Sequence, residues 1–459
     1  MTVAPKDTDL ILPLLDAEWA RIDLMLVLAE AMRTGVDLPE SFSDEFDSQA
    51  KSVETARAAG SWTGLTTIAP RDALDELKQI DLDLLALAVA PVARPALGPR
   101  IHSLQPQIGG AFPGLPLVQE MLMLKAAGDV DLLFQRLSPT APMVAAGLLR
   151  VEGSTPYQVL RPGARVIRAI LNRDAELAPP PGANLSNQRG KWTELILPPQ
   201  ALSQLRDFTA WVHHNDRIGS EWGGKTMHGP LALFSGASGT GKTFAASVVA
   251  TALSERTSEP WALYTLDLGR IMSKYVGETE ANLNALLESL DGRRAILQID
   301  EADGLLGKRG EVSDARDRYA NLEVSHMLSR FERHNGPVIL TTNLRSNVDS
   351  AFLRRFQLIV DFPAPDAAAR AELWRILIPA NAPRADRLDV LAVGDAVRLS
   401  GGSIANAAHY AAVLAAEDET PIDLPHIARA VRAELMKDGR QVRKSEIGFL
   451  CDHLSEDWT

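Results

Sequence analysis

The N-terminal part of the chain has the hydrophobic pattern of a helical domain. Apolar residues recur at helical spacing over residues 10–58, and the same spacing predicts two further helices over residues 70–91 and 115–129. Residues 147–171 alternate short β-prone runs with turn residues, a pattern compatible with a small winged-helix-like unit. We therefore expect a mainly helical region over residues 1–176.

A change of composition follows this region. The segment LAPPPGANLSNQRGK, residues 177–191, holds three consecutive prolines followed by Gly, Asn and Ser. Such a composition is typical of an extended connector, because proline cannot donate a backbone hydrogen bond and glycine adds flexibility. The pattern places a domain boundary here.

After the connector, the β-prone run LALF leads into SGASGTGKTF and an apolar helical pattern. The run fits G-x-x-x-x-G-K-[ST], the spacing of a loop whose backbone amides cradle phosphate oxygens at the start of a helix. Lys242 can neutralise the β- and γ-phosphates, and the hydroxyl of Thr243 can bind Mg²⁺. The predicted nucleotide-binding residues are Gly236, Ala237, Ser238, Gly239, Thr240, Gly241, Lys242, Thr243 and Phe244.

A second apolar run, residues 295–299, ends in Asp300 and Glu301. Downstream of a phosphate loop, the first carboxylate is expected to hold Mg²⁺ through its water shell. The adjacent glutamate is expected to polarise the water that attacks the γ-phosphate. Gln298 interrupts the apolar run, and we interpret it as pinning the strand.

A third predicted strand, in GPVILTTNL, places Asn343 at its C-terminal end, the edge where open α/β sheets bind ligands. Asn343 is therefore a candidate for contacting the attacking water or the γ-phosphate. Arg354 and Arg355 follow, and two adjacent side chains of a helical turn cannot both face one partner. One would be structural and the other catalytic in a neighbouring subunit.

Composition and charge narrow the class of protein. The 459 residues carry 59 acidic and 47 basic side chains, a net charge of -12, which disfavours nucleic acid as the main partner. The single cysteine, Cys451, cannot form an internal disulfide, and the N-terminus lacks the pattern of a signal peptide. No uncharged run of about 20 residues predicts a membrane span. We expect a cytoplasmic protein.

The ordered set of phosphate loop, Asp300-Glu301, Asn343 and Arg354-Arg355 resembles the AAA+ ATPases. The resemblance implies an α/β fold with a central parallel sheet over residues 192–364, a helical lid over residues 365–437 and a tail over residues 438–459. It also implies ATP and Mg²⁺ as cofactors. The segment SKYVGETEANL looks like the substrate-contacting loop of the AAA clade, whose matching residues line the pore of a ring. The implied substrate-contacting residues are Lys274, Tyr275 and Val276.

The same resemblance implies an oligomer, a homohexamer, in which the arginines reach the neighbouring nucleotide. Arg354 and Arg355 are adjacent, whereas many relatives separate the pair by two residues. The segment LSGGSIANAAHYAAVLAA resembles the family's sensor-2 region, with Gly402 at its helix start and no arginine, as in the AAA clade. By family position, the adenine pocket lies near residues 194–200.

More narrowly, DGLLGKRGEVSDARDRYANLEVSHMLSRFE and LDLLALAVAP resemble bacterial AAA ATPases encoded with phage-tail-like contractile injection systems. We expect a ring-shaped ATPase that remodels, unfolds or disassembles a protein substrate, with the N-terminal region recruiting the partner. One alternative is a nucleotide-driven assembly factor that never threads a chain, with Tyr275 packing a subunit interface. A second is a DNA motor or loader using the winged-helix-like unit, which the acidic charge disfavours.

Overall fold

The computed structural model describes residues 7–173, 179–222, 228–266, 268, 278–303, 325–343, 348, 350–437 and 442–454. The chain forms two compact units, one made of Met1–Ala178, His214–Met227 and Glu288–Arg293, and the other of the remaining residues. Within the described ranges, none of the helices combines the length and hydrophobicity needed to cross a bilayer.

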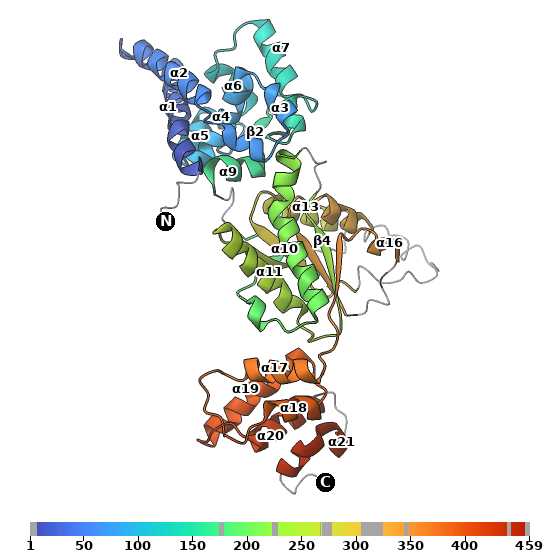
Figure 1. The fold of residues 1–459 in the computed structure, drawn as a ribbon. Helices are drawn as coiled ribbons and strands as arrows, with labels where there is room; N and C mark the ends of the chain where they lie inside the picture. Colours follow the sequence, from blue (N-terminus) through green and yellow to red (C-terminus); the bar gives the residue numbers. More distant parts are fainter. Residues whose placement is uncertain are drawn as a thin grey trace. The chain divides into compact units, whose positions relative to one another are not determined.

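The N-terminal unit is mainly helical, as expected (Figure 1). Its helices are α1 (Asp7–Thr34), α2 (Phe42–Ala58), η1 (Thr63–Thr67), α3 (Arg71–Asp75), α4 (Gln79–Ala93), α5 (Leu97–Leu104), α6 (Leu115–Met121), α7 (Ala127–Arg136), α8 (Pro142–Ala145) and α9 (Ala164–Leu171). A two-stranded antiparallel hairpin, β1 (Leu149–Glu152) and β2 (Val159–Pro162), precedes α9.

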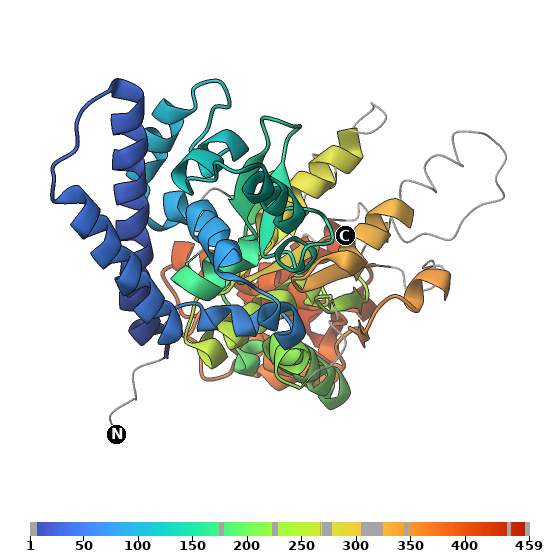
Figure 2. The same cartoon turned by 90° about the horizontal axis from the view of Figure 1, so that it is seen from above.

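Local backbone signals divide the predicted helices. The apolar pattern over residues 10–58 forms two helices, α1 and α2, which lie side by side (Figures 1 and 2). Gly35, with φ of +69°, follows the last residue of α1, and this left-handed backbone ends the helix. Met123, with φ of +54°, likewise separates α6 from α7 inside the predicted helix over residues 115–129. Hydrophobic periodicity continues through such breaks and therefore does not reveal them.

The core of this unit centres on α4. Residues 84–90 of this helix are all at most 2% exposed and pack into one cluster with α1, α5, α6 and α9. An apolar helix buried on all sides is a central core element rather than a surface one. The LDLLALAVAP segment therefore builds the interior of the unit.

The second unit contains a six-stranded sheet with the order β3-β5-β6-β7-β4-β8. Five strands run parallel: β5 (Ala262–Leu266), β6 (Ala295–Ile299), β7 (Val338–Thr342), β4 (Leu231–Ser235) and β8 (Leu358–Asp361). The accompanying helices are η2 (Trp192–Glu194), α10 (Pro199–Ser220), α11 (Lys242–Thr257), α13 (Glu278–Leu290) and α16 (Ser350–Leu353). Every residue of β4, β6 and β7 is buried, as expected for parallel strands covered on both faces. The α/β architecture is confirmed.

The predicted connector differs from the expectation in one respect. Its residues Ala183–Leu185 form β3, which pairs antiparallel with β5 at the edge of the sheet. Only the first of the three residues is buried. Backbone hydrogen bonds to β5, rather than burial of side chains, therefore hold Ala183–Leu185 in the sheet. Such pairing leaves no hydrophobic pattern in the sequence, so the segment was expected to be an extended connector.

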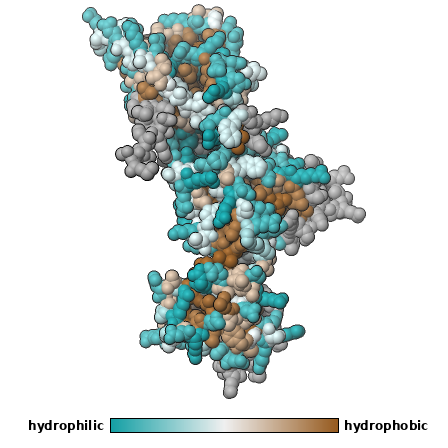
Figure 3. Space-filling model, viewed as in Figure 1, coloured by the Kyte–Doolittle hydropathy of each residue, from teal (hydrophilic) through white to brown (hydrophobic). Residues whose placement is uncertain are grey.

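A helical lid completes the second unit. Its helices are α17 (Ala367–Leu377), α18 (Val390–Ala396), α19 (Gly401–Glu417) and α20 (Leu424–Met436), around one hydrophobic core. Two further elements, α21 (Lys444–Ile447) and η4 (Gly448–His453), lie in the segment expected as a tail, and their residues Ile447 and Leu450 are buried in the same core. Hydrophobic residues also show on the face of the lid seen in Figure 3. Its exposed large hydrophobic residues are Leu391, Tyr410, Val413, Met436 and Phe449.

Candidate functional site

The phosphate loop lies between β4 and α11, in the order that the sequence predicts. Its backbone requires glycine at two positions, because Gly239 has φ of +76° and Gly241 has φ of +95°. Gly241 is the N-cap of α11, so the N-terminal amides of a 16-residue helix face the loop. An anion bound here is favoured by both the amides and the helix dipole.

Lys242, the first residue of α11, points into the loop. Its Nζ donates to the carbonyl oxygens of Gly236, at 2.6 Å, and Ala237, at 3.0 Å, and to Oδ1 of Asn343, at 2.9 Å. Only 8% of the residue is exposed, and burial lowers the pKa of its ammonium group, against the opposing effect of nearby carboxylates led by Asp300. The contact brings together two predicted residues that lie 101 positions apart.

Asp300 and Thr243 provide a pair of neighbouring oxygen donors at the phosphate loop. The hydroxyl of Thr243 lies 3.3 Å from Oδ1 and 3.4 Å from Oδ2 of Asp300. Hydroxyl and carboxylate oxygens are the donors that Mg²⁺ prefers, and Mg²⁺ usually takes few protein ligands and completes its shell with water and phosphate. In the described part of the chain, no cluster of three or more His, Cys, Asp or Glu residues could hold a metal. The donor pair fits Mg²⁺ bound together with a nucleotide.

Glu301 follows Asp300 in a left-handed backbone conformation, with φ of +52° and an exposed side chain. Non-glycine residues seldom adopt this conformation, and they do so chiefly where surrounding contacts hold them. The amide of Glu301 donates to the hydroxyl of Thr341 at 3.1 Å, and the next amide, of Ala302, donates to the carbonyl of Thr341 at 2.8 Å. These two bonds hold the turn that presents the carboxylate beside the phosphate loop.

Asp303 is a part of the site that the sequence reasoning missed. Its carboxylate accepts hydrogen bonds from the hydroxyl of Thr342, at 2.5 Å, and from the backbone amide of Asn343, at 3.2 Å. It thus ties the turn after β6 to the C-terminal end of β7, next to the Asn343 side chain. The signal available in the sequence was a third acidic residue in IDEAD, two positions after Glu301.

Arg354 and Arg355 have different environments just after α16. Nη1 of Arg355 lies 2.9 Å from Oε1 of Glu332 within the same chain. Arg354 is exposed and has no hydrogen-bond or ion-pair partner among the residues that the structure describes. The structure thus separates two residues that the sequence left equivalent.

The lid reaches the phosphate loop through α19. The amide of Gly402 donates to the carbonyl of Gly239 at 2.8 Å, and a Cβ atom on Gly239 would lie 2.6 Å from Oγ of Ser400. A Cβ atom on Gly402 would approach Cα of Gly239 to 3.1 Å. Two glycines, one from each part, therefore allow direct backbone contact between the loop and the start of α19.

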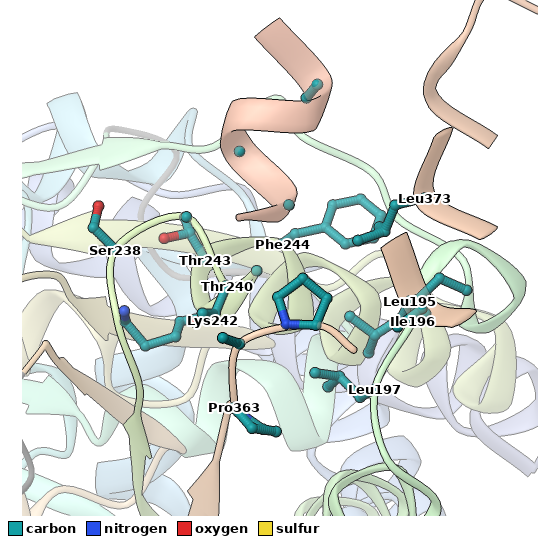
Figure 4. A pocket seen from close by; sticks show the side chains of 18 of the residues that line it. Leu195, Ile196, Leu197, Ser238, Thr240, Lys242, Thr243, Phe244, Pro363 and Leu373 are labelled. Carbon is teal, nitrogen blue, oxygen red and sulfur yellow. The ribbon is translucent and has the colours of Figure 1, made fainter. Parts of the chain in front are cut away.

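A cavity of about 1570 Å³ is lined by the phosphate loop, residues 194–199, the length of α17 and the start of α19. Figure 4 shows its two halves. Lys242, Ser238 and Thr243 lie on one side, and Phe244, Leu373 and Ile196 lie on the other. A polar end for phosphates and an apolar end for a flat base are what a nucleotide requires. The sequence placed the apolar end at residues 194–200 but missed the contribution of Leu373.

Some predicted residues lie outside the described part of the chain. The loop residues Lys274, Tyr275 and Val276 are among them, as is most of the DGLLGKRGEVSDARDRYANLEVSHML segment. Their assignment as substrate-contacting or family-specific residues stays a prediction from the sequence.

Comparison with known proteins agrees with this geometry. Residues 232–364 match the family described as "ATPase family associated with various cellular activities (AAA)". Over 158 residues the chain is 32% identical to vacuolar protein sorting-associated protein 4A of Homo sapiens and 31% identical to protein 4B of Mus musculus; each match covers 34% of this chain and 33% of the relative. A match of 335 residues at 23% identity to the ATPase family gene 2 protein of Schizosaccharomyces pombe covers 69% of this chain and 39% of that protein. The chain thus spans well under half the length of these relatives.

Proposed function

We propose that this chain, which carries an AAA ATPase domain over residues 232–364, hydrolyses Mg-ATP and uses the cycle to remodel a protein substrate as a ring. The observation that carries the proposal is the contact of Lys242 with Asn343, at 2.9 Å, beside the Thr243–Asp300 pair. Two polar groups at the start of α11 thus meet one from the turn after β6 and one from the end of β7 at the phosphate loop.

The chemistry follows from the positions of these groups. The loop amides and Lys242 bind and orient the β- and γ-phosphates, so that Nζ exchanges its carbonyl partners for phosphate oxygens. Thr243 and Asp300 would hold Mg²⁺, which neutralises charge that develops on the phosphates. Glu301 orients the attacking water and accepts its proton, because its carboxylate is exposed beside the loop. Asn343 contacts the γ-phosphate or the water through its amide.

Arg354 is the residue that we assign to the neighbouring nucleotide. A catalytic arginine supplied to another subunit must be exposed and without a partner in its own chain, and Arg354 has both properties among the described residues. Arg355 is held by Glu332 and would stabilise the loop that carries Arg354.

The substrate and the ring are inferred from the sequence, since the pore-loop residues lie outside the described part of the chain. Tyr275 would grip an extended polypeptide in the pore, since an aromatic ring buries area against many sequences without specific hydrogen bonds. The resemblance to the ATPases of contractile injection systems indicates that the protein substrate is a component of such a system. One of the two segments that carry this resemblance forms the buried helix α4, so its simplest role is packing.

Glu301→Gln tests the proposal. The variant should retain nucleotide but not hydrolyse it, and with Mg-ATP it should form a closed hexamer by mass measurement and electron microscopy. Retained hydrolysis would contradict the role of Glu301, and a monomer at every concentration would contradict the ring.

A second variant tests threading. In the wild-type background, Tyr275→Ala should abolish protein unfolding while ATP hydrolysis persists. Intact remodelling would favour an assembly factor that never threads a chain.

A further inference from the structure

The interior of the sheet contains two polar side chains that both face Asp300. Gln298, in β6, has no exposed surface, and Thr341, in β7, is 2% exposed. Nε2 of Gln298 donates to Oδ1 of Asp300 at 2.7 Å, and the hydroxyl of Thr341 donates to the same oxygen at 3.0 Å. Every other residue of β6 is apolar.

These two bonds distinguish the two oxygens of the carboxylate. An ionised carboxylate oxygen has two lone-pair sites, and Gln298 and Thr341 can fill both sites of Oδ1. The hydroxyl of Thr243 lies near both oxygens, 3.3 Å from Oδ1 and 3.4 Å from Oδ2, and is the hydrogen-bond partner of Oδ2 among the described residues. The two shorter bonds both hold Oδ1, which leaves Oδ2 as the oxygen available to a metal-bound water.

The Thr341 hydroxyl acts on Glu301 as well. While it donates to Asp300, it accepts the amide of Glu301 at 3.1 Å. One hydroxyl group thus supports the Asp300 carboxylate and the left-handed backbone of Glu301. Loss of this hydroxyl removes both contacts, whereas serine in its place retains them.

Packing alone does not explain Gln298. Its Oε1 is buried and has no hydrogen-bond partner among the described residues. A buried acceptor without a partner destabilises the fold relative to an apolar side chain of similar shape. The polar interaction that this side chain makes is the hydrogen bond from its Nε2 to Asp300.

We propose that Gln298 and Thr341 are positioning residues that orient the Asp300 carboxylate toward the Mg²⁺ of the bound nucleotide. This inference rests on the proposed function, because it assumes that Mg-nucleotide occupies the phosphate loop. Groups that orient a metal-binding side chain typically change metal affinity or activity by about 10- to 100-fold when removed.

The test measures binding rather than turnover. The affinity for a fluorescent ADP analogue is determined with Mg²⁺ and with EDTA, and the ratio gives the metal-dependent gain. Gln298→Met and Thr341→Val should each reduce this gain about tenfold and leave the affinity in EDTA unchanged. Thr341→Ser should keep it. Thr209→Val is the matched control, because Thr209 is a 4% exposed residue whose hydroxyl donates to the Leu205 carbonyl of its own helix and to no other group among the described residues.

Thermal unfolding in EDTA separates positioning from packing. Gln298→Met should unfold close to the wild-type temperature, because removal of the unpartnered buried Oε1 offsets the loss of the Nε2 bond to Asp300. A wild-type metal-dependent gain in both Gln298→Met and Thr341→Val would overturn the proposal, as would a loss in Thr341→Ser equal to that in Thr341→Val. If the wild-type chain itself binds no nucleotide in either buffer, the proposed function fails instead.

Discussion

Nη1 of Arg355 lies 2.9 Å from Oε1 of Glu332, whereas the neighbouring Arg354 is exposed and has no partner among the described residues. The ion pair fixes one guanidinium within its own chain and leaves the other available. Glu332 lies 23 positions before Arg355 and in a different element. The difference between the two arginines therefore depends on how these segments pack and could not be inferred from their neighbouring residues.

Arg354→Ala should abolish ATP hydrolysis, by at least about 10³-fold if the arginine acts in the neighbouring site. Nucleotide affinity and unfolding temperature should remain close to wild type. Arg355→Ala should instead lower the free energy of unfolding by up to about 1 kcal/mol, because its ion pair is partly exposed.

Mixing two inactive variants tests whether Arg354 acts in a neighbouring subunit. A Glu301→Gln subunit can supply Arg354 to an Arg354→Ala subunit, whose own Glu301 is intact. A mixture should therefore regain part of the wild-type hydrolysis, which neither variant shows alone. An inactive mixture, in rings shown to contain both variants, would place Arg354 in its own subunit's site or outside catalysis.

The lowered pKa of Lys242 predicts an alkaline limit to nucleotide capture. Burial disfavours the ammonium form, so this group loses its proton below its ordinary pKa of 10.5. The profile of kcat/KM against pH, which reports the free enzyme, should therefore fall on an alkaline limb with a midpoint below 10.5.

The same shift affects stability with a defined sign. Between the folded and unfolded pKa values of Lys242, the unfolded chain binds more protons, so this group makes unfolding less favourable as pH rises through that window. Circular dichroism over the same pH range would show whether the fold persists while kcat/KM falls. A limb with a midpoint at or above 10.5 in a folded protein would contradict the assignment to Lys242.

The sequence predicted those features that depend on local pattern. The phosphate loop, the strand that precedes Asp300 and the strand that precedes Asn343 can each be recognised within about ten residues of sequence. Their residues could be expected to meet, because parallel strands present their C-terminal ends at one edge of the sheet. Strand order and the antiparallel edge strand β3 could not be predicted, because backbone pairing selects them and side-chain pattern carries little trace of it.

The supporting contacts of the site were equally hidden. Gln298 was noticed as a polar interruption of β6, but its partner depended on how Asp300 turns at the end of that strand. Thr341 is a β-branched residue of the kind common in strands, and its bond to Asp300 depends on the pairing of β6 with β7. Asp303 became meaningful only once the turn after β6 was known to meet the end of β7. Contacts between distant segments are a product of the assembled sheet.

Asp303 provides the last prediction. Asp303→Ala removes the acceptor of the Thr342 hydroxyl and the Asn343 amide, so the end of β7 loses the support that positions Asn343. Hydrogen bonds to a charged group contribute about 1.5–3 kcal/mol each, so a loss of about tenfold or more in kcat is expected. Nucleotide affinity should change much less, because Lys242 and the loop amides remain.

Asp389→Ala is the matched control. Asp389, like Asp303, is a carboxylate that accepts hydrogen bonds from two groups of the following residues or of another segment, in its case the backbone amides of Leu391 and Ala392, but it caps α18 in the lid. Its loss should lower the free energy of unfolding by about 1 kcal/mol with little change in kcat. Single-turnover hydrolysis and thermal unfolding of both variants would distinguish the two roles. If Asp303→Ala and Asp389→Ala lose stability equally and both keep the wild-type rate, Asp303 only stabilises the fold and Asn343 needs no such support.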